Sequence, residues 1–157
     1  MADEIQLVVF DLGNEEYGVD IHQTREILKM QEITRIPNSP AFIRGIINVR
    51  GRILVVVSLR EKFKLEPQEG RYILIADADG SSFGIMVDKV TEILRIKSED
   101  VKKAPSIVAE KIHGEYLKGV AVLGERLIIL LNLQKILSEG EMTKIQEAKS
   151  GPMKVHN

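Results

Sequence analysis

The sequence predicts a mainly β fold in which two small five-stranded barrels, related by internal duplication, pack against each other and are followed by a short C-terminal helix. Short runs rich in branched and aromatic residues alternate with turns that contain glycine. The order of these runs repeats in the second half of the chain. Each half supplies five short strands, a pattern typical of a small barrel that closes and so removes its edges.

The first half contains a long hairpin that is the clearest element of the chain. Its two strands flank the dipeptide Arg50-Gly51, and branched residues on both sides of a short glycine turn are the signal for a β-hairpin. The second of these strands is continuously apolar, so we expect both of its faces to be covered. The strands predicted in this half cover residues 5–12, 17–21, 26–30, 46–49 and 53–57.

The second half repeats this order. Tyr17 aligns with Phe83 at an offset of 66, and Phe42 aligns with Tyr116 at an offset of 74, so one insertion separates two otherwise matching units. A duplicated unit is the better explanation, although its period exceeds that of ordinary solenoid repeats. The predicted strands are 71–78, 83–87, 92–96, 116–123 and 126–131, of which 127–131 is again continuously apolar.

These elements predict a single domain over residues 1–157 with two subdomains. The first covers about 14–70 and the second about 71–138, with the strand 5–12 near their interface. A helix is expected to begin at Leu133 and continue to residue 138. Residues 139–157 are expected to hold the end of this helix and a flexible tail, because Ser150-Gly151-Pro152 would stop any helix there.

Composition limits the possible functions. With 22 basic and 23 acidic residues well mixed, the net charge is −1, and no charged footprint for nucleic acid or anionic lipid is visible. The absence of cysteine excludes a thiol nucleophile, a disulfide framework and a cysteine-based zinc site. The N-terminus is acidic and the longest apolar runs have five residues, so a cytoplasmic protein without a membrane span is expected.

No catalytic, metal or cofactor site is predicted. The glycine spacing from Gly13 to Gly18 resembles a phosphate-binding loop, but Val19-Asp20 stands where lysine and serine or threonine are needed. Ser58 ends a strand without the Gly-x-Ser-x-Gly frame of a nucleophile, and the three histidines lack ligand spacing. We therefore expect a protein that is not an enzyme.

A protein-binding surface is the remaining interpretation. Two packed barrels create a groove that turn residues such as Arg50, Arg52, Thr24 and Val90 could line, and arginine beside apolar residues is typical of a binding hot spot. Three alternatives stay open. Arg50 could be an ordinary solvated charge, the groove could bind a small ligand, or the barrels could bind nucleic acid, although aromatic platforms are few.

The motifs of the chain resemble the CheW family of bacterial chemotaxis coupling proteins. The similarity reaches to about Glu141, and without an attached receiver or kinase domain the chain is similar to the stand-alone adaptors of that family. The residues that carry the resemblance are Phe10-x-Leu-Gly-x-Glu-x-Tyr-Gly-Val-x-Ile21, Glu26-Ile27, Ile36-Pro-Asn-x-Pro-x-Phe-Ile-x-Gly45, Ile47-Asn-Val-Arg-Gly51 and Leu59-Arg60.

The resemblance implies two intertwined five-stranded SH3-like barrels and a non-enzymatic adaptor that needs no cofactor. It implies binding to the regulatory domain of the chemotaxis histidine kinase and to the helical cytoplasmic tip of chemoreceptors. Neither nucleic acid nor insertion into the membrane is implied. Location would be the inner face of the membrane, through receptor arrays.

The resemblance also implies two sets of site residues. A receptor helix would lie in the groove with Arg50 as polar anchor, although the glycines of this set could equally be structural. The family usually has proline at Val55, aspartate at Ser58 and often valine at Thr24. The receptor set is Thr24, Gly45, Arg50, Gly51, Gly84, Val90 and Ile93, and the kinase set is Glu26, Leu28, Ile53 and Tyr72.

Overall fold

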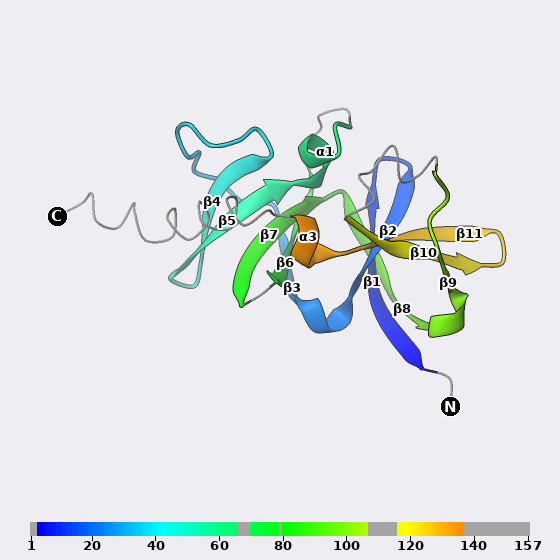
Figure 1. Ribbon diagram of the computed structural model, residues 1–157. Helices are drawn as coiled ribbons and strands as arrows, with labels where there is room; N and C mark the ends of the chain where they lie inside the picture. Colours follow the sequence, from blue (N-terminus) through cyan, green and yellow to red (C-terminus); the bar gives the residue numbers. More distant parts are fainter. Residues whose placement is uncertain (1–2, 66–69, 79, 107–115, 137–157) are drawn as a thin grey trace.

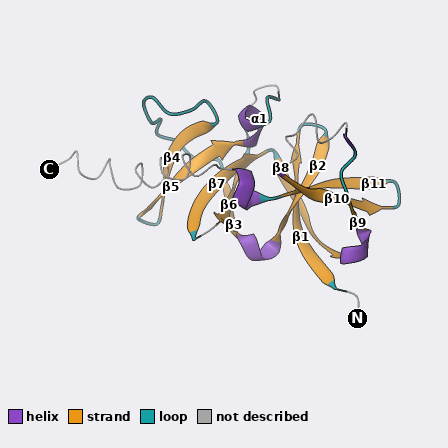
Figure 2. Cartoon of the chain, viewed as in Figure 1, coloured by secondary structure: helices purple, strands orange, loops and turns teal. Residues whose placement is uncertain are grey.

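Eleven strands and four short helical segments make up the part of the chain that the structure describes (Figure 1, Figure 2). The structure is a computed structural model that describes residues 3–65, 70–78, 80–106 and 116–136. The strands are β1 (Glu4–Leu12), β2 (Glu15–Asp20), β3 (Thr24–Lys29), β4 (Ile43–Val49), β5 (Arg52–Ser58), β6 (Tyr72–Ala78), β7 (Ser81–Val87), β8 (Lys89–Lys97), β9 (Val101–Lys102), β10 (Leu117–Leu123) and β11 (Arg126–Leu131). The helical segments are η1 (Ile21–Gln23), α1 (Leu59–Lys62), η2 (Ser98–Asp100) and α3 (Leu133–Ile136).

The strands form two sheets, as the predicted mainly β class requires. The five-stranded sheet, which we call the first barrel, has the order β3-β6-β7-β5-β4, and the six-stranded sheet, the second barrel, has the order β8-β1-β2-β11-β10-β9. The second sheet has one strand more than predicted because the two-residue β9 adds to β10.

The predicted subdomain boundaries, 14–70 and 71–138, do not coincide with the sheets. The first barrel takes β6 and β7 from the second half of the chain, and the second barrel takes β1 and β2 from the first half. The halves exchange strands, because β3 pairs with β6 and β8 pairs with β1. Each barrel is therefore completed by strands from the other half of the sequence.

Strand register confirms the duplication. Tyr17 pairs in parallel with Ile129, and at the same offsets of 66 and 74 Phe83 pairs in parallel with Val55. The irregularity between Ile43 and Gly45 in the β4–β5 hairpin recurs between Leu117 and Gly119 in the β10–β11 hairpin. These correspondences let each position of one barrel serve as an internal control for the other.

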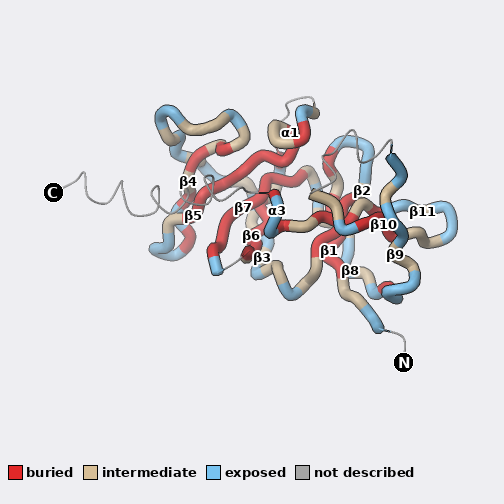
Figure 3. The backbone as a smooth tube through the Cα atoms, viewed as in Figure 1, coloured by how far each residue is buried: buried red, intermediate tan, exposed pale blue. Residues whose placement is uncertain are grey.

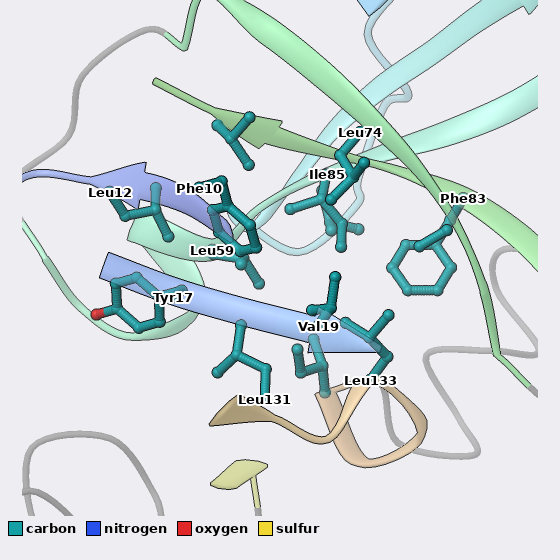
Figure 4. Close-up of a cluster of buried hydrophobic side chains, with 14 of the residues drawn as sticks. Phe10, Leu12, Tyr17, Val19, Leu59, Leu74, Phe83, Ile85, Leu131 and Leu133 are labelled. Carbon is teal, nitrogen blue, oxygen red and sulfur yellow. The ribbon is translucent and has the colours of Figure 1, made fainter. Parts of the chain in front are cut away.

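The core explains why β5 is continuously apolar. Val55 and Val57 face a central cluster shared by both barrels, and Val56 faces a cluster inside the first barrel. Figure 4 shows this central cluster, which contains Phe10 and Tyr17 of the second barrel and Leu74 of the first. Buried segments accordingly run through the middle of the molecule (Figure 3). The packing of the two barrels on each other is confirmed.

The prediction that residues 127–131 are covered on both faces is wrong at its first position. Leu127 is 58% exposed at the start of β11, whereas Ile128 is buried inside the second barrel. Sequence hydrophobicity alone could not distinguish Leu127 from the buried positions that follow it.

A short helix follows the last strand of each long hairpin, α1 after β5 and α3 after β11. The described part of the predicted 133–138 helix is α3, whose Leu133 and Ile136 are buried in the central cluster. The rest of that prediction, and the tail predicted for 139–157, lie outside the described residues. The helix α1 was not predicted. It is capped by Ser58, whose Oγ accepts a hydrogen bond from the Glu61 amide at 3.3 Å.

Candidate partner-binding site

The tip of the β4–β5 hairpin presents Arg50 to solvent. Arg50 (φ 50°) and Gly51 (φ 88°) both have positive φ, which a tight two-residue hairpin turn of the common type requires. The Asn48 side-chain carbonyl accepts a hydrogen bond from the Gly51 amide at 2.8 Å. The predicted Asn-x-Arg-Gly motif is therefore the turn that orients the Arg50 side chain.

Arg50 forms an ion pair with Glu26 of β3. The guanidinium side chain is 71% exposed and the carboxylate side chain 33% exposed, so a partner can reach both. The hydrogen bond from Arg50 holds the pKa of the Glu26 carboxyl below its usual value. The resemblance implied a receptor contact for Arg50 and a kinase contact for Glu26, whereas the structure brings the two side chains together.

Gly45 and Gly84 have structural reasons to be glycine. A Cβ at Gly45 would lie 2.2 Å from the Thr34 carbonyl oxygen, because the segment around Thr34 hydrogen-bonds to Ile46 across this point. At Gly84 a Cβ would lie 2.7 Å from Cγ2 of Ile73 in the core. Gly51 differs, because nothing lies within 4 Å of its added Cβ. Only Gly51 of the three is both open and on the surface.

Thr24 and Val90 occupy equivalent positions in the two barrels. Each lies at an irregularity in the pairing with a strand of the other half, Thr24 opposite Ala76 and Val90 opposite Phe10. The Thr24 hydroxyl donates a hydrogen bond to the Ile21 carbonyl at 2.8 Å, and Val90 packs against the central cluster. Both predicted receptor residues are half-buried, and their outer atoms remain reachable.

Ile93 is an exposed apolar residue on β8, with 60% of its surface accessible. Its equivalent on β3 is Ile27, which is 47% exposed and adjacent to Glu26. Sequence reasoning missed Ile27 as a site residue, because strand alternation does not reveal which face of a strand is covered. The matching offset of 66 from Ile93 was the available signal.

The kinase set lies entirely on the first barrel. Leu28 packs against the inner cluster of this barrel and Tyr72 against the central cluster, and both are half-buried. Ile53 is half-buried at the start of β5, three residues from Arg50. The predicted receptor set, by contrast, is divided between the two barrels (Figure 1). Thr24, Gly45, Arg50, Gly51 and Gly84 belong to the first barrel, and Val90 and Ile93 lie on β8 of the second.

Arg126 forms ion pairs with two acidic residues of the second barrel, a charged cluster that sequence reasoning missed. Its Nε and Nη2 donate to the two carboxylate oxygens of Glu16 at 2.8 and 2.9 Å, and Nη2 also lies 2.6 Å from a carboxylate oxygen of Glu92. The hydrogen bonds from Arg126 hold the pKa of Glu16 below its usual value. Glu92 is the equivalent of Glu26, so both barrels pair this acid with an arginine of their hairpin.

A second missed contact ties the barrels together. The nearly buried Arg60 of α1 donates from Nη2 to an Asp88 carboxylate oxygen at 2.6 Å, and the same oxygen accepts the Gly13 amide at 2.9 Å. Asp88 joins β7 of the first barrel to β8 of the second, and Gly13 lies in the β1–β2 turn. The Leu59-Arg60 motif therefore fixes the junction between the barrels.

A row of aromatic rings follows the same junction. Phe10 and Tyr17 stack with ring centroids 5.9 Å apart, and Tyr17 stacks on Phe63 at 6.1 Å. Tyr116 continues the row 6.0 Å from Phe63. Burial raises the pKa of Tyr17 to about 12. Phe10, Tyr17 and Phe63 are buried core residues, and the half-buried Tyr116 packs against the same cluster.

Neither a metal cluster nor a membrane helix is found in the described part of the chain. Within residues 3–65, 70–78, 80–106 and 116–136, no three histidine, cysteine or acidic side chains gather as a metal site would require. Among the same residues, no helix is long and apolar enough to cross a membrane.

Comparisons with known proteins give the family. A family model described as "CheW-like domain" matches residues 6–141. The chain is 38% identical to a chemotaxis protein CheW from Klebsiella aerogenes over 92% of this chain and 89% of that protein. It is 32% identical to one from Treponema pallidum over 91% and 88% of the two chains.

A solved structure agrees with the sequence matches. The crystal structure of the scaffolding protein TtCheW from Thermoanaerobacter tengcongensis superposes with a TM-score of 0.79 at 32% sequence identity, over 87% of this chain and 89% of that one. Family model, relatives and structure all extend over both barrels. This chain belongs to the CheW-like family.

Proposed function

We propose that this protein is a non-enzymatic adaptor of bacterial chemotaxis, which couples the cytoplasmic tips of chemoreceptors to the chemotaxis histidine kinase and modulates kinase activity. Membership of the CheW-like family and the similarity to a scaffolding protein support this proposal. The receptors would hold the adaptor at the inner face of the membrane. The adaptor itself would contact only proteins.

The exposed end of the first barrel carries the proposal. Here the Arg50–Glu26 ion pair lies close in sequence to the partly exposed Ile53 and the exposed Ile27. Arginine and apolar side chains around a reachable charge pair are the composition of a binding hot spot. We assign the kinase contact to Glu26, Leu28, Ile53 and Tyr72.

The receptor contact is assigned to Arg50 as polar anchor, with Thr24 and Gly51 of the first barrel and Val90 and Ile93 of the second as further contacts. Gly45 and Gly84 support the backbone beneath this surface rather than contact the partner. Arg50 already pairs with Glu26, so a receptor carboxylate that attracts Arg50 changes the charge that Glu26 presents to the kinase. This exchange is a physical route by which one partner could alter the affinity for the other, typically by about 5- to 150-fold.

Titration calorimetry against an isolated chemotaxis kinase regulatory domain tests the kinase contact. Ile53→Asp is compared with Leu127→Asp, because residues 53 and 127 are equivalent in the two barrels. We expect wild type and Leu127→Asp to bind saturably with one-to-one stoichiometry and Ile53→Asp to lose binding. Binding that survives Ile53→Asp would move the contact away from this end. A folded sample without binding at about 50 µM would contradict the adaptor function.

The receptor contact is tested with a soluble receptor-tip fragment. Arg50→Gln is compared with Arg52→Gln, a change of the same charge on the same hairpin at a residue for which no ion pair is found among the described residues. Arg50→Gln should weaken receptor binding at least tenfold, and Arg52→Gln should leave it nearly unchanged. Equal losses in the two variants would indicate general electrostatic attraction instead of an anchor at Arg50.

A further inference from the structure

Each barrel contains a pocket of similar size at the same place in the duplicated unit. The pocket of the first barrel has a volume of about 330 Å³ and is lined by Met30, Gln31, Ile33, Arg35, Arg44 and Met86. The pocket of the second barrel has a volume of about 370 Å³, and Asp20, Val101 and Lys118 are among its lining residues. Both volumes lie near the lower limit of small-ligand pockets.

The duplication relates the lining residues position by position. Arg44 corresponds to Lys118 at the offset of 74, and Met86 corresponds to Asp20 at the offset of 66. Ile33 corresponds to Val101, since Thr34 bridges Ile46 just as Lys102 pairs with Val120. The two pockets are therefore the same feature with different side chains.

The charges of the two pockets differ. The second-barrel pocket contains both a cation, Lys118, and an anion, Asp20. In the first-barrel pocket methionine replaces the acid, two arginines are present, and no described lining residue is acidic. Neither Arg35 nor Arg44 forms an ion pair with any residue in the described ranges. The first-barrel pocket thus holds two positive charges without a carboxylate among the described residues.

The floor of this pocket is apolar and adaptable. Met30 and Ile33 pack against the inner cluster of the first barrel, to which Met86 itself belongs. Methionine adapts its shape to different apolar partners, and arginine recognises carboxylates through a planar pair of donors. The combination suits an acidic side chain beside an apolar one.

We propose that the first-barrel pocket binds an acidic segment of a partner protein, with a carboxylate between Arg35 and Arg44 and a neighbouring apolar side chain on Met30, Ile33 and Met86. The pocket lies at the end of the barrel opposite the Arg50 hairpin, because Met86 pairs with Ser58 at the last position of β5, whereas Arg52 begins that strand. It is therefore separate from the Arg50–Glu26 surface, and none of its lining residues belongs to the proposed kinase or receptor set.

Methyl NMR of the full chain, labelled with ¹³C at the methionine methyl groups, reports on this pocket directly. Met30 and Met86 are the two methionines among the described residues, and both line the pocket. The probe is the peptide acetyl-Asp-Leu-Glu-amide, with acetyl-Asn-Leu-Gln-amide as the neutral control. We expect saturable shifts of both methyl signals by the acidic peptide with a Kd of about 1 mM or tighter, and no saturation by the neutral peptide.

Two variants locate the charge requirement. The double variant Arg35→Gln/Arg44→Gln should weaken binding of the acidic peptide at least tenfold, whereas Lys118→Gln, the matched change in the second-barrel pocket, should leave it unchanged. Methyl spectra of the free variants that match wild type establish that each is folded. Equal binding of both peptides, shifts that persist in the double variant, or no saturable shift would each overturn the proposal. Concentration-dependent shifts without peptide, accompanied by dimers in sedimentation, would assign the pocket to a second copy and also overturn it.

Discussion

Gly45→Ala should destabilise the fold more than any other glycine-to-alanine change at the predicted binding surface. Gly45 has a φ of 147°, in a region that side-chain-bearing residues rarely adopt. An alanine Cβ would lie 2.2 Å from the Thr34 carbonyl oxygen and 2.7 Å from the Ile33 side chain. The oxygen cannot yield easily, because Thr34 exchanges two backbone hydrogen bonds with Ile46 at 2.7 and 2.9 Å.

The expected magnitude follows from these two separate costs. A residue held in a disfavoured backbone region costs about 1–3 kcal/mol, and forcing an extra methyl group into a packed site typically costs a further 1–3 kcal/mol. We therefore expect Gly45→Ala to lower the free energy of unfolding by about 4 kcal/mol. This loss is a large share of the roughly 5–15 kcal/mol that stabilises a typical domain.

Two other glycines separate the two costs, and a third combines them. Gly51→Ala has backbone strain without a close contact, since nothing lies within 4 Å of its Cβ. We expect it to lower the free energy of unfolding by about 1–2 kcal/mol. Gly84→Ala has a close contact with Ile73 without a positive φ. Gly119→Ala, the equivalent of Gly45, has both a φ of 151° and a Cβ 2.6 Å from the Lys102 carbonyl oxygen, so it should resemble Gly45→Ala.

Urea unfolding followed by far-ultraviolet circular dichroism measures these changes, with the m-value as a check on two-state behaviour. Gly45→Ala that loses no more stability than Gly51→Ala would refute the reasoning. The result also matters for function. Loss of receptor binding by Gly45→Ala would reflect a smaller folded fraction, whereas loss of binding by Gly51→Ala would report on the surface itself.

Two further predictions concern charged groups. Arg60→Met should lower the free energy of unfolding by about 2–3 kcal/mol in the same urea assay, because it leaves the partly buried Asp88 carboxylate without the guanidinium that contacts it. Arg60→Lys should recover part of this loss. An unchanged urea midpoint for Arg60→Met would contradict the role of Arg60 at the junction between the barrels. Glu16 has a lowered folded-state pKa, so its contribution to stability is present above its usual value of 4.5 and is lost as the pH falls through the lowered pKa. Glu16→Gln should therefore lose less stability than wild type between about pH 5 and pH 3. Glu125→Gln, a change at a turn residue, is the control. If the free energy of unfolding of wild type and of Glu16→Gln falls in parallel with pH, Glu16 does not make this contribution.

Local sequence patterns predicted most strands and the duplication. Branched residues around Arg50-Gly51 indicated the hairpin, and the offsets of 66 and 74 recur in the strand pairs of both barrels. The exchange of the β1–β2 and β6–β7 pairs between the two halves could not be predicted from these patterns. An alternating strand pairs equally well with several neighbours, and long-range packing decides which of them it meets.

The sequence by itself determined that this protein is a duplicated β protein, and its motifs indicated its family. Only the tertiary structure decided which site residues meet. It joined Arg50 to Glu26, which lie 24 residues apart, and placed the Thr34 backbone against Gly45. It also left Arg35 and Arg44 without an acidic neighbour among the lining residues of their pocket. These features depend on side chains and backbone segments that converge from distant parts of the chain, and no local pattern carries that information.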